Sequence, residues 1–205
     1  MIALFFEVLP RPDHEATYLD MAAKLRPALD ASGGLTFLDR VRSALRPAWF
    51  LSHQFWADDA SMVRWRANGA HHRAQACGRT DVLADYRLRV APVIAQVTAG
   101  ALIAEQKQRG MANHAPGSKP DRFVVSVISH GAVDGIGGET FASVYDASLA
   151  VQIVPVVTEA EGLGVLTTAA AHHGLQRASL CLVSRDYGMY DRAEAPQYFE
   201  PVTLA

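Results

Sequence analysis

The hydrophobic positions in the first half of the chain switch between two spacings. Runs in which apolar residues dominate or alternate with polar ones predict strands, and stretches in which apolar residues recur every three or four positions predict helices. Pro10 ends the first run, because proline cannot donate to a strand ladder. The predicted order is strand 2–9, helix 13–31, strand 35–45, strand 50–56, helix 61–79 and strand 85–90. This β-α-β-β-α-β order is the split βαβ, or ferredoxin-like, arrangement.

A second, shorter version of this pattern follows. A shift of 101 residues superposes three features of the two halves: run 50–55 on 151–156, Asp58 on Glu159, and Ala70-His71-His72 on Ala171-His172-His173. Strand-like runs at 122–129 and 177–185 lie at the two ends of this version, and its helix opens with the capping box Thr158-x-x-Glu161. Only residues 131–138, four of them glycine, stand where the first half has a whole helix. We expect an internal duplication whose second copy is degenerate and lacks the first helix.

These patterns predict an α+β fold of tandem ferredoxin-like repeats, with one domain at 1–98 and a second at 122–205. The segment 99–121 is predicted to be a linker, because its second part contains Pro116, Gly117, Ser118 and Pro120. A single ferredoxin-like sheet leaves one apolar face uncovered. The two antiparallel sheets must therefore cover each other or the sheets of a second chain.

Composition narrows the class of protein. Half of the 205 residues are apolar, which is enough for a substantial core, and the formal net charge is only −2. The 19 basic residues are spread along the chain, which argues against a nucleic-acid surface or a polybasic membrane patch. The first residues lack the features of a signal peptide, and no apolar run approaches the roughly 20 residues that cross a bilayer. With Cys77 and Cys181 not in CxxC spacing, we expect a soluble, cytoplasmic protein.

The predicted helix 61–79 carries the main candidates for chemistry. One continuous helix would align five residues on one face: Met62, Trp65, Gly69, His72 and Ala76. Trp65 and His72 would then lie only about 20° apart around the helix axis, whereas His71 would point elsewhere. An indole and a titratable imidazole on one buried face indicate either core packing or a site.

Both explanations apply to each of these side chains. Trp65 is a large ring that can simply pack in the core, and His72 can be a neutral histidine bonded to a backbone carbonyl. The matching His173, in a copy without the tryptophan, favours that structural role. Histidine also exchanges its proton near pH 7, so His72 can serve as a general base. Tyr86 alternates with apolar residues in strand 85–90 and can reach the same region.

The sequence predicts no metal or cofactor site. Adjacent histidines on a helix, as at 71–72 and 172–173, point about 100° apart and cannot both reach one ion. The glycine-rich segment 131–138 does not open a helix, and there is no Walker or Rossmann motif. Metal, nucleotide and flavin cofactors are therefore not expected.

A set of residues in the first half resembles the antibiotic biosynthesis monooxygenase (ABM) family of the dimeric α+β barrel superfamily. The resemblance rests on Leu51-Ser52-His53-Gln54-Phe55-Trp56, Asp58-Asp59, Trp65-Arg66, His72, Gln75, Gly78-Arg79 and Asp85-Tyr86-Arg87, and covers about residues 2–98. The second half resembles only the superfamily topology. The resemblance implies a barrel of two four-stranded sheets with helices outside and a pocket between helix and sheet. We expect closure within one chain and further association into a homodimer.

The resemblance also implies a function. Such proteins oxygenate small aromatic or enolisable substrates without metal or flavin, and the family site uses a tryptophan on this helix. We expect His72 to act as the base, Trp65 to form the pocket wall and orient the substrate, and Tyr86 to be a hydrogen-bond partner of the substrate. The pocket should be mostly apolar and on the order of several hundred Å³.

Two alternatives remain open. Haem-binding or haem-degrading relatives place an asparagine on the first strand and space the tryptophan and histidine by about ten residues. Here strand 2–9 has no asparagine, and Trp65 and His72 are seven apart. The barrel can also be a non-catalytic module that binds a small molecule, or an isomerase or lyase, since a fold does not determine chemistry.

Overall fold

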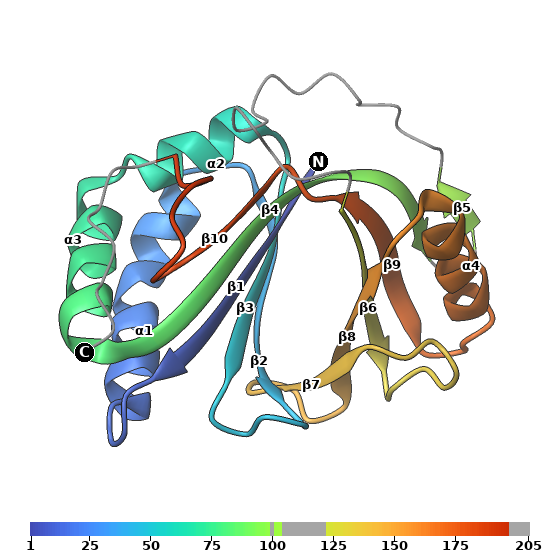
Figure 1. The fold of residues 1–205 in the computed structure, drawn as a ribbon, viewed down its shortest axis with the longest axis horizontal. Coiled ribbons are helices and arrows are strands. Elements are labelled where there is room, and N and C mark those ends of the chain that lie inside the picture. The colour runs from blue at the N-terminus through green and yellow to red at the C-terminus, as the bar shows by residue number, and fades with distance from the viewer. Residues whose placement is uncertain (99–100, 104–121, 197–205) are drawn as a thin grey trace.

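One antiparallel sheet runs through both halves of the chain in the computed structural model, which describes residues 1–98, 101–103 and 122–196 (Figure 1). The elements in chain order are β1 (Ile2–Pro10), α1 (Glu15–Ala31), β2 (Leu35–Ser43), β3 (Phe50–Trp56), α2 (Asp59–Arg66), α3 (Gly69–Cys77), a π-helical turn (Gly78–Val82), β4 (Leu83–Thr98), β5 (Ala101–Ile103), β6 (Phe123–His130), β7 (Glu139–Ser143), β8 (Leu149–Val156), α4 (Glu159–Ala170), β9 (Leu175–Leu182) and β10 (Arg185–Gly188).

The strands close into a barrel within a single chain. Their order is β1-β3-β2-β7-β8-β6-β9-β4, and β4 pairs with β1 to complete the ring. The segment 83–92 of β4 pairs with β1, while its segment 93–97 pairs with β9. The predicted α+β barrel of antiparallel sheets with outer helices is confirmed. A second chain is not needed for closure, and the predicted homodimer stays a prediction.

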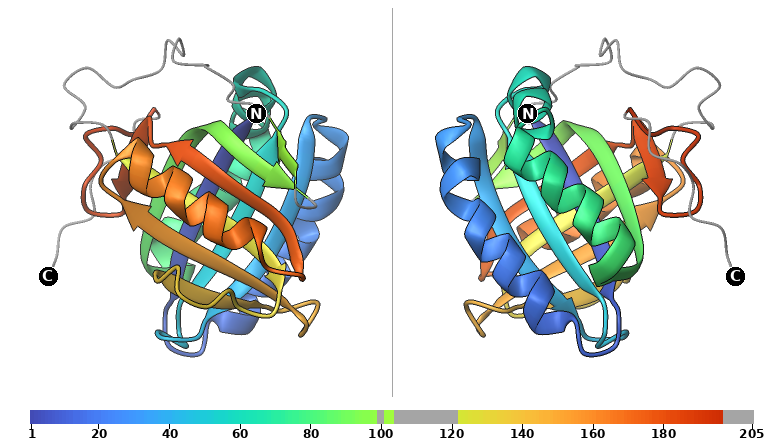
Figure 2. Two further views of the ribbon diagram at one scale, coloured as in Figure 1. Left: turned by 90° about the vertical axis from the view of Figure 1, so that its right-hand side faces the viewer. Right: turned by 90° about the vertical axis from the view of Figure 1, so that its left-hand side faces the viewer.

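Helices cover the two halves of the barrel unequally. Figure 2 shows α1 and α3 lying across the outer face of the first half and α4 crossing the outer face of the second. Residues 131–138, between β6 and β7, form a loop and no helix, in agreement with the sequence analysis. Val133 and Ile136 of this loop pack with Leu166 of α4 in the core on that side. Side chains of this loop therefore fill part of the space that a helix would occupy on this face of the sheet.

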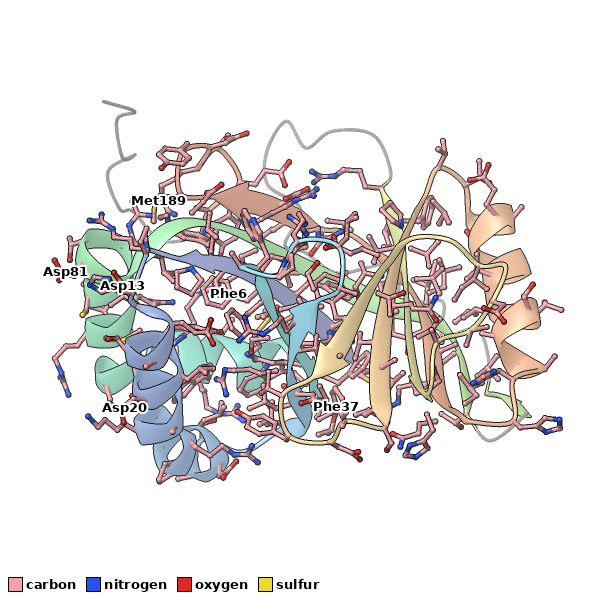
Figure 3. All side chains as sticks on the ribbon, turned by 90° about the horizontal axis from the view of Figure 1, so that it is seen from below. Phe6, Asp13, Asp20, Phe37, Asp81 and Met189 are labelled. Atoms are coloured by element: carbon pink, nitrogen blue, oxygen red, sulfur yellow. The ribbon has the colours of Figure 1, made fainter. Side chains whose placement is uncertain are left out.

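Side chains from both halves fill the interior of the barrel. Phe5, Leu51 and Phe55 of the first half contact a core that includes Val124 and Val151 of the second. Figure 3 shows the side chains between the two halves and labels Phe37, which is partly buried and packs against this core. Alternate residues of each strand point inward, as the two-residue period of a strand requires. The barrel interior is therefore a core.

His53 is a fully buried histidine in this interior. Its Nδ1 lies 3.2 Å from the Leu4 carbonyl oxygen and its Nε2 lies 2.7 Å from Ser126 Oγ. The carbonyl can only accept, so Nδ1 carries the proton and Nε2 accepts from the serine hydroxyl. The Phe5 ring stacks on the imidazole at a centroid distance of 4.7 Å. His53 thus joins the two halves, in agreement with the structural role that it is expected to have as a lone histidine in an apolar strand.

Ion pairs also cross between the halves. Glu7 accepts from Arg89 at 2.7 Å and from Arg46 at 3.0 Å, and Arg46 in turn donates to Glu139 of β7 at 2.6 Å. Arg87 pairs instead with Asp186 of β10, at 2.7 Å. These arginines are therefore engaged in the structure of the barrel.

The 101-residue shift between the halves is wrong by one residue. The N-caps of the equivalent helices, Asp58 and Thr158, are 100 residues apart. Leu51 and Val151 both face the barrel interior, whereas Phe50 packs on the helix side. A shift of one residue moves a strand residue to the opposite face of the sheet. The 101-residue alignment therefore pairs positions that are not structurally equivalent, and the two histidine triplets are among them. The duplication itself stays a prediction.

The predicted linker 99–121 falls largely outside the described residues. Its segment 101–103 forms β5, which pairs with the end of β4. Residues 197–205 of the predicted second domain also lie outside the described part. The division at 98 and 122 stays a prediction, because β4 is hydrogen-bonded to strands of both halves. In the part of the chain that is described, no helix has the length and apolar character needed to span a membrane.

Stability should fall in acid because of His53. Burial is the main reason that the pKa of His53 is lowered to about 4 from its ordinary value of 6.5. Between these values the unfolded chain binds a proton that the folded protein does not, so the free energy of unfolding decreases as the pH falls from 6.5 to 4. The His53 contribution to this decrease is up to about 3 kcal/mol.

Urea unfolding at a series of pH values checks this expectation. His53→Leu should lower stability at pH 7, since Ser126 loses its acceptor, but should flatten the pH dependence below 6.5. His173→Gln, which changes an exposed histidine, serves as the control and should keep the wild-type slope. An unchanged slope in the His53 variant would contradict the assignment.

Candidate functional site

The outer face of the first half carries a cavity of about 170 Å³. Its lining residues come mainly from helices α1, α2 and α3 and from strands β1, β3 and β4 beneath them. Figure 2 shows α1 and α3 over this sheet. Its lining is mostly apolar, with contributions from Leu4, Phe6, Leu25, Leu29 and Met62. The volume is smaller than the several hundred Å³ expected, and it suits a small ligand, since an apolar cavity of roughly 150 Å³ holds benzene.

The helix predicted at 61–79 is broken in two next to this cavity. Helix α2 ends at Arg66, and Asn68 caps a new helix, α3, by accepting hydrogen bonds from the backbone N–H of Ala70 at 2.9 Å and of His71 at 3.3 Å. An asparagine side chain competes in this way with helical backbone bonds, so it favours a helix start over a helix interior. The prediction of one continuous helix is therefore wrong.

This break exchanges the roles of the two adjacent histidines. The His71 ring stacks on the Trp65 ring, with centroids 4.4 Å apart and planes 16° from parallel, and it lines the cavity. Its Nδ1 lies 3.2 Å from the Trp65 carbonyl oxygen and must donate to it, which leaves the lone pair on Nε2. His72 is exposed and does not line the cavity. The expectation that His72 shares a face with Trp65 is wrong.

His71 has the electronic state that a base needs. Burial lowers its pKa to about 4, the hydrogen bond to the Trp65 carbonyl opposes this shift, and the neighbouring His72 adds to it. The ring is therefore neutral at pH 7. A neutral imidazole with Nε2 unprotonated can accept a proton from a ligand.

Trp65 and Tyr86, the other two candidate residues, both line the cavity and are both buried. Trp65 packs with Met62, while Tyr86 lies on the outward face of β4 next to Phe6, with ring centroids 5.7 Å apart. The Tyr86 hydroxyl oxygen accepts hydrogen bonds from Arg79 and, at 2.5 Å, from Arg192. The structure thus brings Trp65 and Tyr86 into one cavity and adds His71 to them.

Among the buried polar atoms at the cavity that have no hydrogen-bond partner in the described residues are the Tyr18 hydroxyl of α1 and Gln75 Oε1 of α3. The Arg40 guanidinium lies 6.0 Å from the centroid of the Tyr18 ring, and its positive charge partly opposes the effect of burial on the pKa of the Tyr18 hydroxyl. Burial raises the pKa of Tyr18, so its hydroxyl stays protonated and remains a donor. A ligand with one acceptor and one donor would satisfy both atoms.

The C-terminal segment of the described chain completes the cavity wall. Strand β10 pairs with β4 and carries Tyr187, and Arg192 follows in the next turn. Burial, with the neighbouring Tyr86 as a smaller cause, raises the pKa of Tyr187 to about 12.

Sequence reasoning missed Tyr187 and Arg192, because no local pattern shows that they return to the first half. Tyr18 and Gln75 did carry a signal, as members of the helix pattern and of the family motif.

No cluster of three or more His, Cys, Asp or Glu side chains suited to a metal ion occurs in the ranges 1–98, 101–103 and 122–196. The exposed Cys77 does not line the cavity, and Cys181 is buried in the barrel core. Among the described lining residues, the polar groups at the cavity are the imidazole, the phenols, the Ser52 hydroxyl, two amides and the guanidinium groups.

The fold defines a single-chain antiparallel α+β barrel, and the helices of its first half cover a mostly apolar cavity. The family model for antibiotic biosynthesis monooxygenase matches residues 1–76. A protein of Pyricularia oryzae named jasmonate monooxygenase ABM is 34% identical over 217 residues, which cover 99% of this chain and 100% of that protein. The chain belongs to the antibiotic biosynthesis monooxygenase family.

Solved structures with similar folds are more distant. A candidate monooxygenase from Fusobacterium nucleatum has a TM-score of 0.44 at 9% identity, covering 90% of this chain and 93% of that one. A candidate antibiotic biosynthesis monooxygenase from Deinococcus radiodurans has a TM-score of 0.39 at 16% identity, covering 44% of this chain and 89% of that one. Similarities of this size indicate nothing about substrate or mechanism.

The side chain of Asn68 should stabilise the start of α3, which positions His71 at the cavity. Asn68→Ala removes the acceptor for two backbone N–H groups and should lower the free energy of unfolding by about 1 kcal/mol. Asn68→Asp keeps the capping oxygen and should stay close to wild type. Chemical denaturation of the three proteins measures the difference. Equal destabilisation by Ala and Asp would contradict the capping role.

Proposed function

We propose that this protein is a monooxygenase that oxidises a small aromatic or enolisable substrate in the cavity beneath α1–α3, without metal or flavin, and that His71 is its base. The observation that carries this proposal is the neutral His71 ring held against Trp65 at the wall of an apolar cavity. A base in such a place can remove a proton from a ligand, and the apolar walls limit the access of water to the resulting anion.

The reaction balances without an added reductant when the substrate has a methylene group activated by a carbonyl or an aryl group. The base takes one C–H proton, and the carbanion transfers electrons to O₂ and forms a C–O bond. Loss of the second C–H proton with cleavage of the O–O bond then gives a ketone and water. The sum is R₂CH₂ + O₂ → R₂CO + H₂O, in which the substrate carbon supplies all four electrons.

Tyr86 has a role beside His71 in this proposal. Its hydroxyl oxygen already accepts hydrogen bonds from Arg79 and Arg192, so its own proton is available to a third group. Donation to the oxygen of the substrate would stabilise the enolate or phenolate that forms when the proton leaves. Trp65 forms the wall that holds His71 in place.

The name of the Pyricularia oryzae relative supports oxygenation of a small organic molecule as the reaction class. It does not transfer the substrate, because the identity is only 34%. Haem binding is less well supported, since a porphyrin is much larger than a cavity of about 170 Å³ and His72 lies outside it. A haemin titration without a saturable Soret shift would remove that alternative.

The adjacent histidines provide a matched pair of variants. His71→Gln should reduce kcat/KM by a factor of about 10²–10⁴, the usual contribution of a general base, while His72→Gln should leave it close to wild type. Oxygen uptake with 2-indanone, which has a methylene flanked by an aryl group and a carbonyl, measures both. The reverse ranking of the two variants would restore His72 as the base, and two fully active variants would refute the proposal.

The pH dependence of turnover gives an independent check. Because the pKa of His71 is lowered to about 4, the base is deprotonated above that value. We expect kcat/KM to rise with pH through about 4 and then to stay level towards neutrality. His71→Gln should lack this acid limb. Circular dichroism at each pH ensures that only folded protein is compared, and a limb near the ordinary histidine value of 6.5 would contradict the assignment.

A further inference from the structure

One corner of the cavity is formed by Tyr18 of α1, Arg40 of β2 and Ser52 of β3. Arg40 and Ser52 are directly opposite each other in the antiparallel pairing of β2 with β3, so their side chains leave the same face of the sheet about 5 Å apart. The Arg40 guanidinium also lies 6.0 Å from the centroid of the Tyr18 ring. We call this part of the cavity the Arg40 corner.

Arg40 brings a positive charge to this corner, and in the described part of the chain it forms no ion pair with a carboxylate. Its Nη1 donates to Tyr145 Oη at 3.0 Å, and its Nε is buried without a hydrogen-bond partner among these residues. The adjacent Asp39 points to the opposite face of β2, where it accepts from Ser143 Oγ at 3.0 Å. The described lining residues include no aspartate or glutamate, so an anionic group of a ligand can approach Arg40.

The hydroxyl hydrogen of Ser52 is also left without an acceptor, because a row of hydrogen bonds along β3 has a fixed direction. The indole N–H of Trp56 can only donate, and it donates to Gln54 Oε1 at 3.0 Å. The amide nitrogen of Gln54 must then face Ser52, and it donates to Ser52 Oγ at 3.2 Å. Ser52 is buried and lines the cavity, so its own hydrogen is available to a ligand.

The Arg40 corner therefore suits an oxygen atom that carries negative charge, since a guanidinium and a hydroxyl both donate to such an atom. Tyr86 is a separate polar point of the same cavity. It lies on β4, whereas Ser52 lies on β3, and β1 separates the two strands with Phe6, which pairs with Ser52 and packs against the Tyr86 ring. An anion whose charge is shared between two oxygens through a conjugated system matches both points.

We propose that Arg40 and Ser52 form an oxyanion site, and that the substrate is a neutral enol or phenol conjugated with a carbonyl group. One oxygen of its anion binds to Arg40 and Ser52, and the other accepts a hydrogen bond from Tyr86. The assignment of this ligand as a substrate rests on the proposed oxygenase function, in which the anion transfers electrons to O₂. Tyr145, which belongs to the second half of the chain, positions Arg40 in the site.

Ionisation of bound 4-hydroxyacetophenone tests the proposal, because this compound joins a phenol to a conjugated ketone and its phenolate has a distinct absorption band. Absorbance of the saturated complex as a function of pH, recorded under nitrogen, gives the pKa of the bound phenol without turnover. In wild type this pKa should lie about 1–3 pH units below that of the free phenol, because a nearby opposite charge favours the anion. Arg40→Gln should lose most of this decrease.

Arg42 provides a matched control, since it lies two residues further along the same face of β2 but pairs with Glu15 and does not line the cavity. Arg42→Gln should leave the pKa of the bound phenol at its wild-type value. Arg40→Lys keeps the charge and should keep much of the decrease.

Ser52→Ala is a small substitution that keeps the proposal testable if Arg40→Gln does not fold. It should raise the pKa of the bound phenol by about 1 pH unit, the contribution of one hydrogen bond to a charged group. Thermal unfolding is recorded for all variants. A wild-type value at or above that of the free phenol, an unchanged value in folded Arg40→Gln or Ser52→Ala, or no saturable binding would each overturn the proposal.

Oxygen uptake with 2-indanone separates this inference from the proposed function. A lowered pKa of the bound phenol that depends on Arg40, without oxygen uptake, would support the oxyanion site and refute the oxygenase. Oxygen uptake together with a pKa that Arg40→Gln leaves unchanged would support the oxygenase and refute the oxyanion site.

Discussion

Strand β4 is hydrogen-bonded along both edges, and the rest of the structure depends on this double pairing. One edge pairs with β1 over residues 83–92, and the other pairs with β9 and β10. The strand thereby joins the first strand of the chain to the last ones and closes the barrel. Closure pairs the edges that an open sheet would expose and buries the inner faces of both halves against each other. His53 and the Glu7–Arg46–Glu139 ion pairs then tie the same two halves together.

The helix that the second half lacks accounts for the different packing on the outer faces of the two halves. In the first half, α1 and the α2–α3 pair stand over the sheet and leave a cavity. In the second half, Val133 and Ile136 of the loop 131–138 pack with α4 and the sheet. Because this loop packs against the sheet, its side chains fill the space that would lie between the sheet and a helix. The second half therefore completes the barrel and contributes Tyr187 and Arg192 to the cavity of the first.

The position of the proposed base, His71, depends on the helix cap that Asn68 forms. The asparagine caps α3 and breaks the helical phase between Trp65 and the two histidines. The His71 ring stacks on the indole, is partly buried and is neutral, while His72 is exposed. One capping side chain thus determines which of two adjacent imidazoles lines the cavity. The same arrangement uses the backbone carbonyl of Trp65 to select the tautomer of His71.

The sequence by itself determined the β-α-β-β-α-β order of the first half, apart from the break between α2 and α3. It also determined the absence of a helix at 131–138 and the likeness of the first half to its family. These features follow from local periodicity and from motifs. The sequence also predicted that Trp65 and Tyr86 belong to one site, and both residues line the cavity. Tertiary structure decided the one-residue correction of the repeat, since face parity in a strand depends on pairing with its neighbours. It likewise decided that His71 lines the cavity and that Arg192 returns to it, because both results depend on contacts between segments that no local pattern relates.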